Sequence, residues 1–250
     1  MEPLFEVIHE DADLLVVNKP AGLVCHPTKG DARSSLISRL RLHLGPTGAP
    51  HLVNRLDRET SGVVIAAKHP AAAGELGRIL EGRGVAKEYL ALVHGTVTDD
   101  RGAVDAPLGK DVNSAVAIKD TVVAGGAASR TEFVVLGRFA RDGAAFSLLK
   151  VQPLTGRKHQ IRIHLAHLGH PIVGDKLYGG DETLYLDLVH DRLNDERRAA
   201  LRLPFQALHA AAVEFTWRER SWRFAAPPEK WFREFAGLPE WAAPFLLDAR

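Results

Sequence analysis

The sequence has only one cysteine, Cys25, among its 250 residues. A single cysteine cannot form a disulfide within the chain. No apolar run approaches the roughly 20 residues that a membrane-spanning helix needs. The acidic first six residues (MEPLFE) lack the basic start and apolar core of a secretion signal. These absences exclude a membrane-spanning protein, and we expect a soluble protein of the reducing cytoplasm with no membrane partner.

An excess of charge of one sign is also lacking, since 32 Lys and Arg face 31 Asp and Glu, for a formal net charge of +1. Contact with a nucleic acid would therefore depend on a local basic surface. The 46% hydrophobic and 25% charged residues are typical of a globular protein. A chain of this length can bury a sizeable core, as one large domain or as two closely joined subdomains.

Hydrophobic patterning predicts both strands and helices. Apolar runs with strand character occupy residues 14–17, 63–67, 89–93, 132–136 and 145–151. A helix is predicted after Ser34 and Ser35, because Leu36, Leu40 and Leu44 recur at a spacing of four before Gly45 and Pro46. Further helical patterns cover residues 71–80 and 187–201, and another helix is predicted to begin near His159.

The order of these elements favours an α+β fold with a mixed, largely antiparallel sheet flanked by helices. The runs 132–136 and 145–151 are joined by a short stretch that contains Arg141, Asp142 and Gly143, which predicts an antiparallel pair. Strict strand–helix alternation, internal repeats and long linkers are absent. We therefore predict a single catalytic domain over residues 1–250, with two closely joined subdomains as an alternative.

Two segments are dense in residues that can carry chemistry. Residues 52–68 place charged and polar side chains before an apolar run, and residues 153–165 combine a glycine turn with basic, amide and imidazole groups. Alone, residues 55–62 (RLDRETSG) would be interpreted as a solvated turn. The presence of two such segments in one chain favours a functional site.

These segments belong to an ordered series of motifs that resembles the RluA-type family of RNA pseudouridine synthases. The resemblance covers nearly the whole chain. Its segments are residues 18–23 (NKPAGL), 55–62 (RLDRETSG), 87–95 (KEYLALVHG), 155–162 (TGRKHQIR), 169–175 (GHPIVGD) and 206–210 (QALHA). It implies a pseudouridine-synthase-like fold with a central RNA-binding cleft, and an isomerase that converts uridines of ribosomal or transfer RNA to pseudouridine without a cofactor or metal.

The resemblance also implies roles for individual residues. Asp57 matches the catalytic carboxylate, which could act as a nucleophile at ribose C1′ or as a base on the sugar. Tyr89 would stack on the uracil, and its hydroxyl could assist removal of the proton from C5. Arg162 would pair with Asp57 and keep it ionised. The residues expected to contact RNA are Arg55, Arg157, Lys158, His159 and Gln160.

The chain departs from the usual family pattern at two positions. Asn54 stands where His usually precedes the Arg-Leu-Asp triplet, and Lys158 stands where Thr is usual. Asn54 can still donate and accept hydrogen bonds, and Lys158 adds a positive charge near the expected RNA site. We expect both to affect substrate preference more than activity.

Other interpretations of the same residues remain open. The fold could bind RNA without catalysing a reaction. Four histidines at positions 159, 164, 167 and 170 could serve a metal-dependent hydrolase, although no His-Glu-x-x-His motif is present. In structural roles, Gly22 would meet a backbone requirement, Asp175 would order a turn, and Trp217, Trp222 and Trp231 would be core or packing residues.

The choice of RNA substrate is not encoded in any separate module of the sequence. About 18 residues precede Lys19, too few for an independent fold, so we expect no N-terminal RNA-binding domain. Recognition would then depend on the catalytic domain and on segments such as residues 108–129 and 187–202. We expect a monomer without an obligate protein partner.

Overall fold

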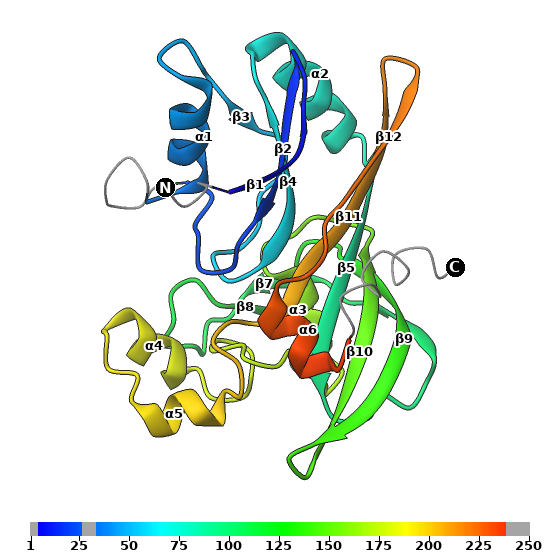
Figure 1. The fold of residues 1–250 in the computed structure, drawn as a ribbon. Helices are drawn as coiled ribbons and strands as arrows, with labels where there is room; N and C mark the ends of the chain where they lie inside the picture. The colour runs from blue at the N-terminus through cyan, green and yellow to red at the C-terminus, as the bar shows by residue number, and fades with distance from the viewer. Residues whose placement is uncertain (1–4, 27–33, 239–250) are drawn as a thin grey trace. The chain divides into compact units, whose positions relative to one another are not determined.

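The computed structural model describes residues 5–26 and 34–238 and has the expected α+β fold (Figure 1). Its contacts divide the chain into two compact units. Unit 1 comprises Met1–Glu88 and His209–Arg250, and unit 2 comprises Tyr89–Leu208. The single catalytic domain stays a prediction. In the described part of the chain no helix is long and apolar enough to cross a membrane.

Unit 1 contains a mixed sheet. Its neighbouring strands are β1 (Glu6–Glu10), β2 (Leu14–Lys19), β4 (Ser61–Ala67) and β11 (Leu208–Trp217, of which only Leu208 belongs to unit 2). Two further strands, β3 (His51–Leu52) and β12 (Arg220–Ala225), pair with β4 and β11. All pairs are antiparallel except β4 with β11. This parallel pair places the start of β4 beside His209 and Ala210.

The described residues of unit 1 form three helices: α1 (Leu36–Leu44), α2 (Pro70–Glu81) and α6 (Lys230–Ala236). The Ser35 hydroxyl accepts a hydrogen bond from the Ser38 amide and caps α1, which ends at Gly45 with φ of 79°. Ala72 and Leu76 of α2 pack on a core formed by β2, β4, β11 and β12, which includes Trp217. The sequence patterns at residues 36–44 and 71–80 correctly predicted α1 and α2.

Unit 2 is built on an antiparallel sheet. Its strands, in order, are β5 (Val85–His94, whose first four residues belong to unit 1), β10 (Ala144–Pro153), β9 (Arg130–Arg141) and β6 (Arg101–Asp105). Asp142 and Gly143 join β9 to β10 with φ of 48° and 72°, a two-residue turn with both central φ angles positive. The predicted antiparallel pair and its turn are thus confirmed.

The remaining elements of unit 2 are two short strands, β7 (Leu108–Lys110) and β8 (Asp120–Val122), and three helices. The helices are α3 (Gln160–His167), α4 (Thr183–Val189) and α5 (Asp195–Ala200). The prediction of one helix over residues 187–201 was wrong. Asp191 adopts a left-handed φ of 55°, and the Asn194 side chain starts a new helix by accepting from the Arg197 amide.

Candidate active site

Asp57 lies in a loop of unit 1 that connects β3 to β4. Its side chain is half-buried, whereas Arg55 and Arg58 on either side are exposed. The Thr60 amide donates to the Asp57 carbonyl at 3.2 Å, which closes a turn directly before β4. The carboxylate is therefore carried by a short turn at the start of a fully buried strand, as the sequence predicted.

Lys19, at the end of β2, anchors this loop through its side chain. Its side chain is completely buried, and Nζ donates to the carbonyls of Pro20, Leu23 and Arg58 at 2.9, 2.8 and 3.1 Å. Burial lowers the pKa of Lys19 to about 8, although neighbouring acidic groups, Asp57 among them, act in the opposite direction. An ammonium group has three N–H donors, and these three bonds use all of them. One of the bonds holds the carbonyl of Arg58, the residue next to Asp57.

Asn54 and Cys25 fix the other end of the loop. The buried Asn54 amide donates from Nδ2 to the Val63 carbonyl at 3.1 Å, and its Oδ1 accepts from the Ile65 amide at 2.8 Å. Sulfur Sγ of Cys25 lies 3.4 Å from both the amide nitrogen and the carbonyl oxygen of Leu56. Asn54 thus donates and accepts hydrogen bonds, as expected, and both bonds tie the start of the loop to β4.

The residues that follow the loop are fixed by β11. Gly62 has φ of 115°, and a Cβ there would lie 2.2 Å from the Ala210 carbonyl oxygen, so only glycine fits. The Ser61 hydroxyl lies 2.9 Å from Nδ1 of His209, whose Nε2 lies 2.9 Å from the Ala226 carbonyl. Since a carbonyl only accepts, Nε2 carries the proton and Nδ1 accepts from Ser61. Burial lowers the pKa of His209 to about 4.

Tyr89 occupies the first position of unit 2 on β5, where it is half-buried. The strand register places it opposite Val151 of β10, and Val151 opposite Phe133 of β9. These three side chains share one face of the sheet. The strand predicted at residues 89–93 is confirmed by β5, and the role of Tyr89 toward a base stays a prediction.

Arg162 is buried in α3, and within unit 2 it forms an ion pair with Asp175. Nε lies 2.7 Å from Oδ2 and Nη2 lies 2.9 Å from Oδ1, which is a two-pronged ion pair. Asp175 does order a turn, as predicted, because Oδ1 also accepts from the amides of Leu177 and Tyr178. The sequence did not predict the ion pair between Asp175 and Arg162. The only signal for a functional role of Asp175 was its position in the segment 169–175. The predicted contact between Arg162 and Asp57 stays a prediction.

The expected RNA-contact residues of unit 2 differ in exposure. Arg157 and Lys158 are exposed, and Lys158 forms an ion pair with Asp120 at 2.8 Å. His159 is half-buried at the start of α3 with φ of 56°, and its Nδ1 lies 2.9 Å from the Tyr178 hydroxyl. Part of the charge of Lys158 is therefore balanced by Asp120.

Gln160 is buried, with 4% of its surface exposed, and its amide is used within unit 2. Oε1 accepts from the Thr155 hydroxyl and the Arg157 amide, and Nε2 donates to the Arg130 carbonyl and the Thr131 hydroxyl. Because these bonds match the capacity of the amide, Gln160 supports the turn that carries Arg157. Its expected role as a direct RNA contact stays a prediction.

The histidines in this part of the chain have other partners. His164 is completely buried, with Nδ1 2.8 Å from the Thr131 hydroxyl and Nε2 3.0 Å from the Ala106 carbonyl. Nδ1 of His170 lies 3.0 Å from the His94 carbonyl. Among residues 5–26 and 34–238 no group of three or more His, Cys, Asp or Glu side chains is arranged to hold a metal ion.

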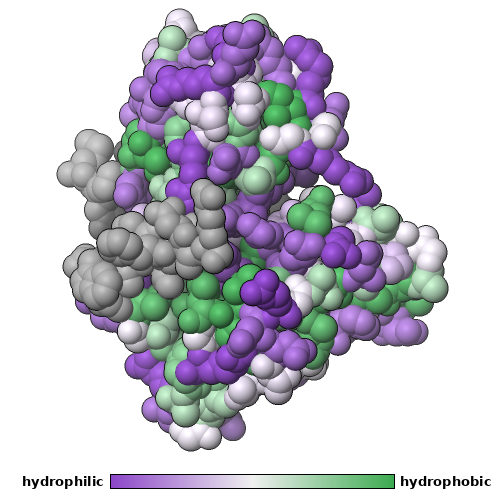
Figure 2. All heavy atoms as spheres, turned by 90° about the vertical axis from the view of Figure 1, so that its right-hand side faces the viewer, coloured by the Kyte–Doolittle hydropathy of each residue, from purple (hydrophilic) through white to green (hydrophobic). Residues whose placement is uncertain are grey.

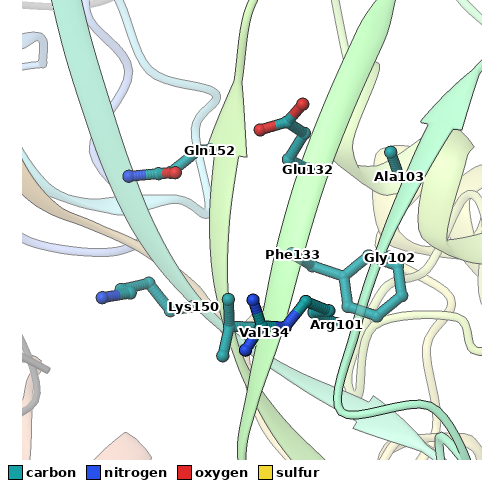
Figure 3. Close-up of a pocket in the computed structure, with 8 residues that line it drawn as sticks. All are labelled: Arg101, Gly102, Ala103, Glu132, Phe133, Val134, Lys150 and Gln152. Atoms are coloured by element: carbon teal, nitrogen blue, oxygen red, sulfur yellow. The ribbon is translucent and has the colours of Figure 1, made fainter. Parts of the chain in front are cut away.

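A cavity of about 420 Å³ lies in unit 2 against β6, β9 and β10 (Figure 3). Lys150 and Gln152 line it and flank Val151, so they point away from the face that carries Tyr89. Figure 3 shows them extending to one side, whereas Phe133 extends toward Gly102. None of the predicted site residues lines this cavity. We therefore do not assign the reaction to it.

The surface drawn in Figure 2 mixes hydrophilic and hydrophobic residues. Across the described residues, strongly exposed large hydrophobic side chains come from separate segments, such as Val112 at 85% and Val189 at 59% exposure. Scattered exposed residues of this kind are normal for globular proteins. They provide no argument for a large apolar partner.

Comparisons with known proteins identify the family. Residues 13–167 match the family model of RNA pseudouridylate synthase. The chain is 38% identical over 214 residues to ribosomal large subunit pseudouridine synthase D of Nitrosomonas europaea, covering 84% of this chain and 58% of that protein. It is 38% identical over 178 residues to mitochondrial tRNA pseudouridine(32) synthase of Saccharomyces cerevisiae, covering 71% of this chain and 38% of that protein.

A solved structure agrees with these sequence matches. Human RNA pseudouridylate synthase domain containing 1 superposes with a TM-score of 0.75 at 25% identity, over 100% of this chain and 98% of that chain. The chain spans about three fifths of the length of the first bacterial relatives that it matches. As the RluA-type motifs predicted, the chain belongs to the RNA pseudouridylate synthase family.

Proposed function

We propose that this chain isomerises specific uridines in ribosomal or transfer RNA to pseudouridine, with Asp57 as the reacting carboxylate. The observation that carries the proposal is the anchoring of the Asp57 turn by Lys19, Asn54 and Cys25 in a chain that belongs to this family. A carboxylate on a fixed turn can be held in a reactive geometry without reorganisation.

The reaction breaks the bond between ribose C1′ and N1 and forms a bond between C1′ and C5. N1 gains a proton and C5 loses one, so no redox partner is needed. Asp57 attacks C1′ or removes a proton from the sugar; both routes require the ionised carboxylate. Arg162 supplies a positive charge opposite to that of the Asp57 carboxylate, and Tyr89 stacks on the uracil while its hydroxyl assists proton removal from C5.

The RNA backbone is held by exposed basic residues. Arg157 and Lys158 lie just before α3 and contact phosphates, with little base specificity. His159 lies in the same turn and contributes a ring beside the RNA. Arg55 fills the space left by the flipped base or holds the flanking backbone. A relative that acts on ribosomal RNA and one that acts on transfer RNA support either substrate class.

The proposal includes the setting in which the enzyme works. We expect a monomer in the cytoplasm, where a free thiol such as buried Cys25 stays reduced. Size-exclusion chromatography with light scattering measures the mass, and the proposal predicts the 27.3 kDa monomer. A stable dimer at micromolar concentration would overturn this part alone.

A transcriptome-wide map of pseudouridine tests the substrate. RNA from cells with this protein, from cells without it and from cells with Asp57→Asn is compared by chemical modification and primer extension. We expect one or a few uridines in ribosomal or transfer RNA to lose the modification both without the protein and with Asp57→Asn. If every site persists in cells that lack other copies of the enzyme, the proposed function is wrong.

A further inference from the structure

The ion pair between Arg162 and Asp175 fixes the guanidinium in one orientation. The side chains are 8% and 0% exposed, and two N–H groups of Arg162 face the two oxygens of Asp175. Burial alone would raise the pKa of Asp175, but the charge and hydrogen bonds of Arg162 and the Leu177 and Tyr178 amides lower it overall. The ionised carboxylate is thus tied to the backbone on one side and to Arg162 on the other.

Tyr178 fixes the plane of the same guanidinium. Cζ of Arg162 lies 4.9 Å from the centroid of the Tyr178 ring, within the range of a cation–π contact. The Tyr178 hydroxyl accepts from the Asp120 amide at 3.3 Å and lies 2.9 Å from Nδ1 of His159. The ring packs in a buried cluster with Leu108, Ile163 and Leu177. Its position therefore does not depend on Arg162.

Fold stability alone does not explain this arrangement. Removing two charges from water offsets most of their attraction, so a buried ion pair adds little net stability compared with apolar residues of similar volume. The neighbours of Arg162 on α3, Ile161 and Ile163, are buried apolar side chains. The ion pair with Asp175 and the contact with the Tyr178 ring together hold the Arg162 guanidinium in one orientation.

We propose that Asp175 and Tyr178 are positioning residues that hold Arg162 in the orientation in which it acts on the reacting carboxylate. This inference rests on the proposed function, because it assigns Arg162 to the reaction. Asp175 and Tyr178 act only through Arg162. A displaced guanidinium would slow the chemical step and leave RNA binding unchanged.

The test uses the purified full chain and total RNA labelled with [5-³H]uridine, taken from cells that lack this protein. Formation of the bond at C5 releases tritium to water, and enzyme in excess over RNA gives the rate of the chemical step. We expect Asp175→Asn and Tyr178→Leu each to lower this rate, by up to about 100-fold for Asp175→Asn. Retention of the same RNA on filters should change by less than about threefold.

A double-mutant cycle separates positioning from a merely structural role. In an Arg162→Gln background, Asp175→Asn should lower the rate by no more than about threefold further. The matched control is Ser147→Ala, which removes a buried hydroxyl bonded to the Gly95 carbonyl and the Val97 amide elsewhere in unit 2. This control should lower stability but keep the wild-type rate per folded molecule.

Two results would overturn the inference. One is a wild-type rate in folded Asp175→Asn and Tyr178→Leu, and the other is a loss that multiplies fully with that of Arg162→Gln. If Asp175→Asn does not fold, Tyr178→Leu alone decides. The proposed function is tested separately: tritium release by Asp57→Asn at the wild-type rate would refute it, whereas an inactive Asp57→Asn with a fully active Asp175→Asn refutes only the positioning role.

Discussion

Lys19 is the residue on which the Asp57 turn depends most directly. Its buried ammonium is the donor to three backbone carbonyls, one of them Arg58 beside Asp57. In Lys19→Met these carbonyls lose their donor, and each buried unsatisfied group costs about 1–3 kcal/mol. We expect a loss of stability of about 3 kcal/mol or more in urea unfolding, together with a large fall in tritium release per folded molecule.

A second lysine of unit 1 provides the control for Lys19. Lys68 donates to the Asp11 carbonyl at 2.8 Å and to Glu10 at 2.9 Å, away from the Asp57 turn. Lys68→Met should therefore lower stability without changing the rate per folded molecule. Equal rates for Lys19→Met and Lys68→Met would show that Lys19 does not hold the reactive loop.

His209 makes stability depend on pH. Burial lowers its pKa from 6.5 to about 4, so between these values the unfolded chain binds a proton that the folded chain does not. Stability is fully present above pH 6.5 and is lost as pH falls toward 4, by about 2 kcal/mol at pH 5. We expect His209→Gln, which keeps a donor and an acceptor, to lose less stability between pH 7.5 and 5 than the wild type.

Urea unfolding at pH 7.5 and pH 5 measures this difference. His94 and His164 also have pKa values lowered by burial, but they are present in both proteins and cancel in the comparison. Ser147→Ala, which removes a buried hydroxyl and no titrating group, provides the control and should keep the wild-type pH response. An unchanged pH response in His209→Gln would contradict the assignment of a buried neutral imidazole.

At the scale of elements, two hairpins with the same turn geometry differ in sequence. Asp142 and Gly143 join β9 to β10, and Arg218 and Glu219 join β11 to β12 with φ of 50° and 61°. The first pair is a typical signal for this turn. The second is not, because L-residues with side chains are strained by about 1–2 kcal/mol in the left-handed region.

Introducing glycine at the second turn position of the β11–β12 hairpin and removing it from the same position of the β9–β10 hairpin should therefore change stability in opposite directions. Glu219→Gly should raise the free energy of unfolding by about 1 kcal/mol, and Gly143→Ala should lower it by about as much. A Cβ at Gly143 would meet no atom within 4 Å, so the change there tests strain alone. Thermal unfolding checks both, and shifts of the same sign would contradict the account.

The same hairpins explain which elements could be predicted from sequence. The β9–β10 pair was predicted because apolar runs flank Asp142 and Gly143, whereas β11 and β12 were missed because Arg218 and Glu219 give no turn signal. Arg218 forms ion pairs with Glu75 and Asp13, which help to hold that turn. These partners are separated from Arg218 by 143 and 205 positions in the sequence, so a local pattern cannot predict them. Likewise, the left-handed Asp191 that separates α4 from α5 gives no helix-stop signal.

The site could be predicted to the level of motifs but not of partners. Asp57, Tyr89 and Arg162 were selected as candidates because each belongs to a segment that resembles the family, and their roles stay predictions. The three carbonyls around Lys19 and the pairing of Asp175 with Arg162 depend on how distant segments fold together. The bonds that saturate the Gln160 amide could not be predicted either, because two of them reach Arg130 and Thr131 of β9.

At the scale of the whole molecule, the proposed chemistry needs groups from both units. The chain passes from unit 1 to unit 2 between Glu88 and Tyr89, so the predicted base-stacking residue is the first residue of unit 2. Asp57 belongs to unit 1, whereas Tyr89 and Arg162 belong to unit 2. The account therefore predicts that loss of any one of these three side chains affects the same chemical step.

The most direct test is tritium release from [5-³H]uridine-labelled RNA by purified protein, comparing the wild type with Asp57→Asn and with Glu59→Gln as a neighbouring carboxylate control. The account predicts release by the wild type and Glu59→Gln and none above background by Asp57→Asn, with the released tritium matched by pseudouridine in the RNA. Release by Asp57→Asn at the wild-type rate would contradict it.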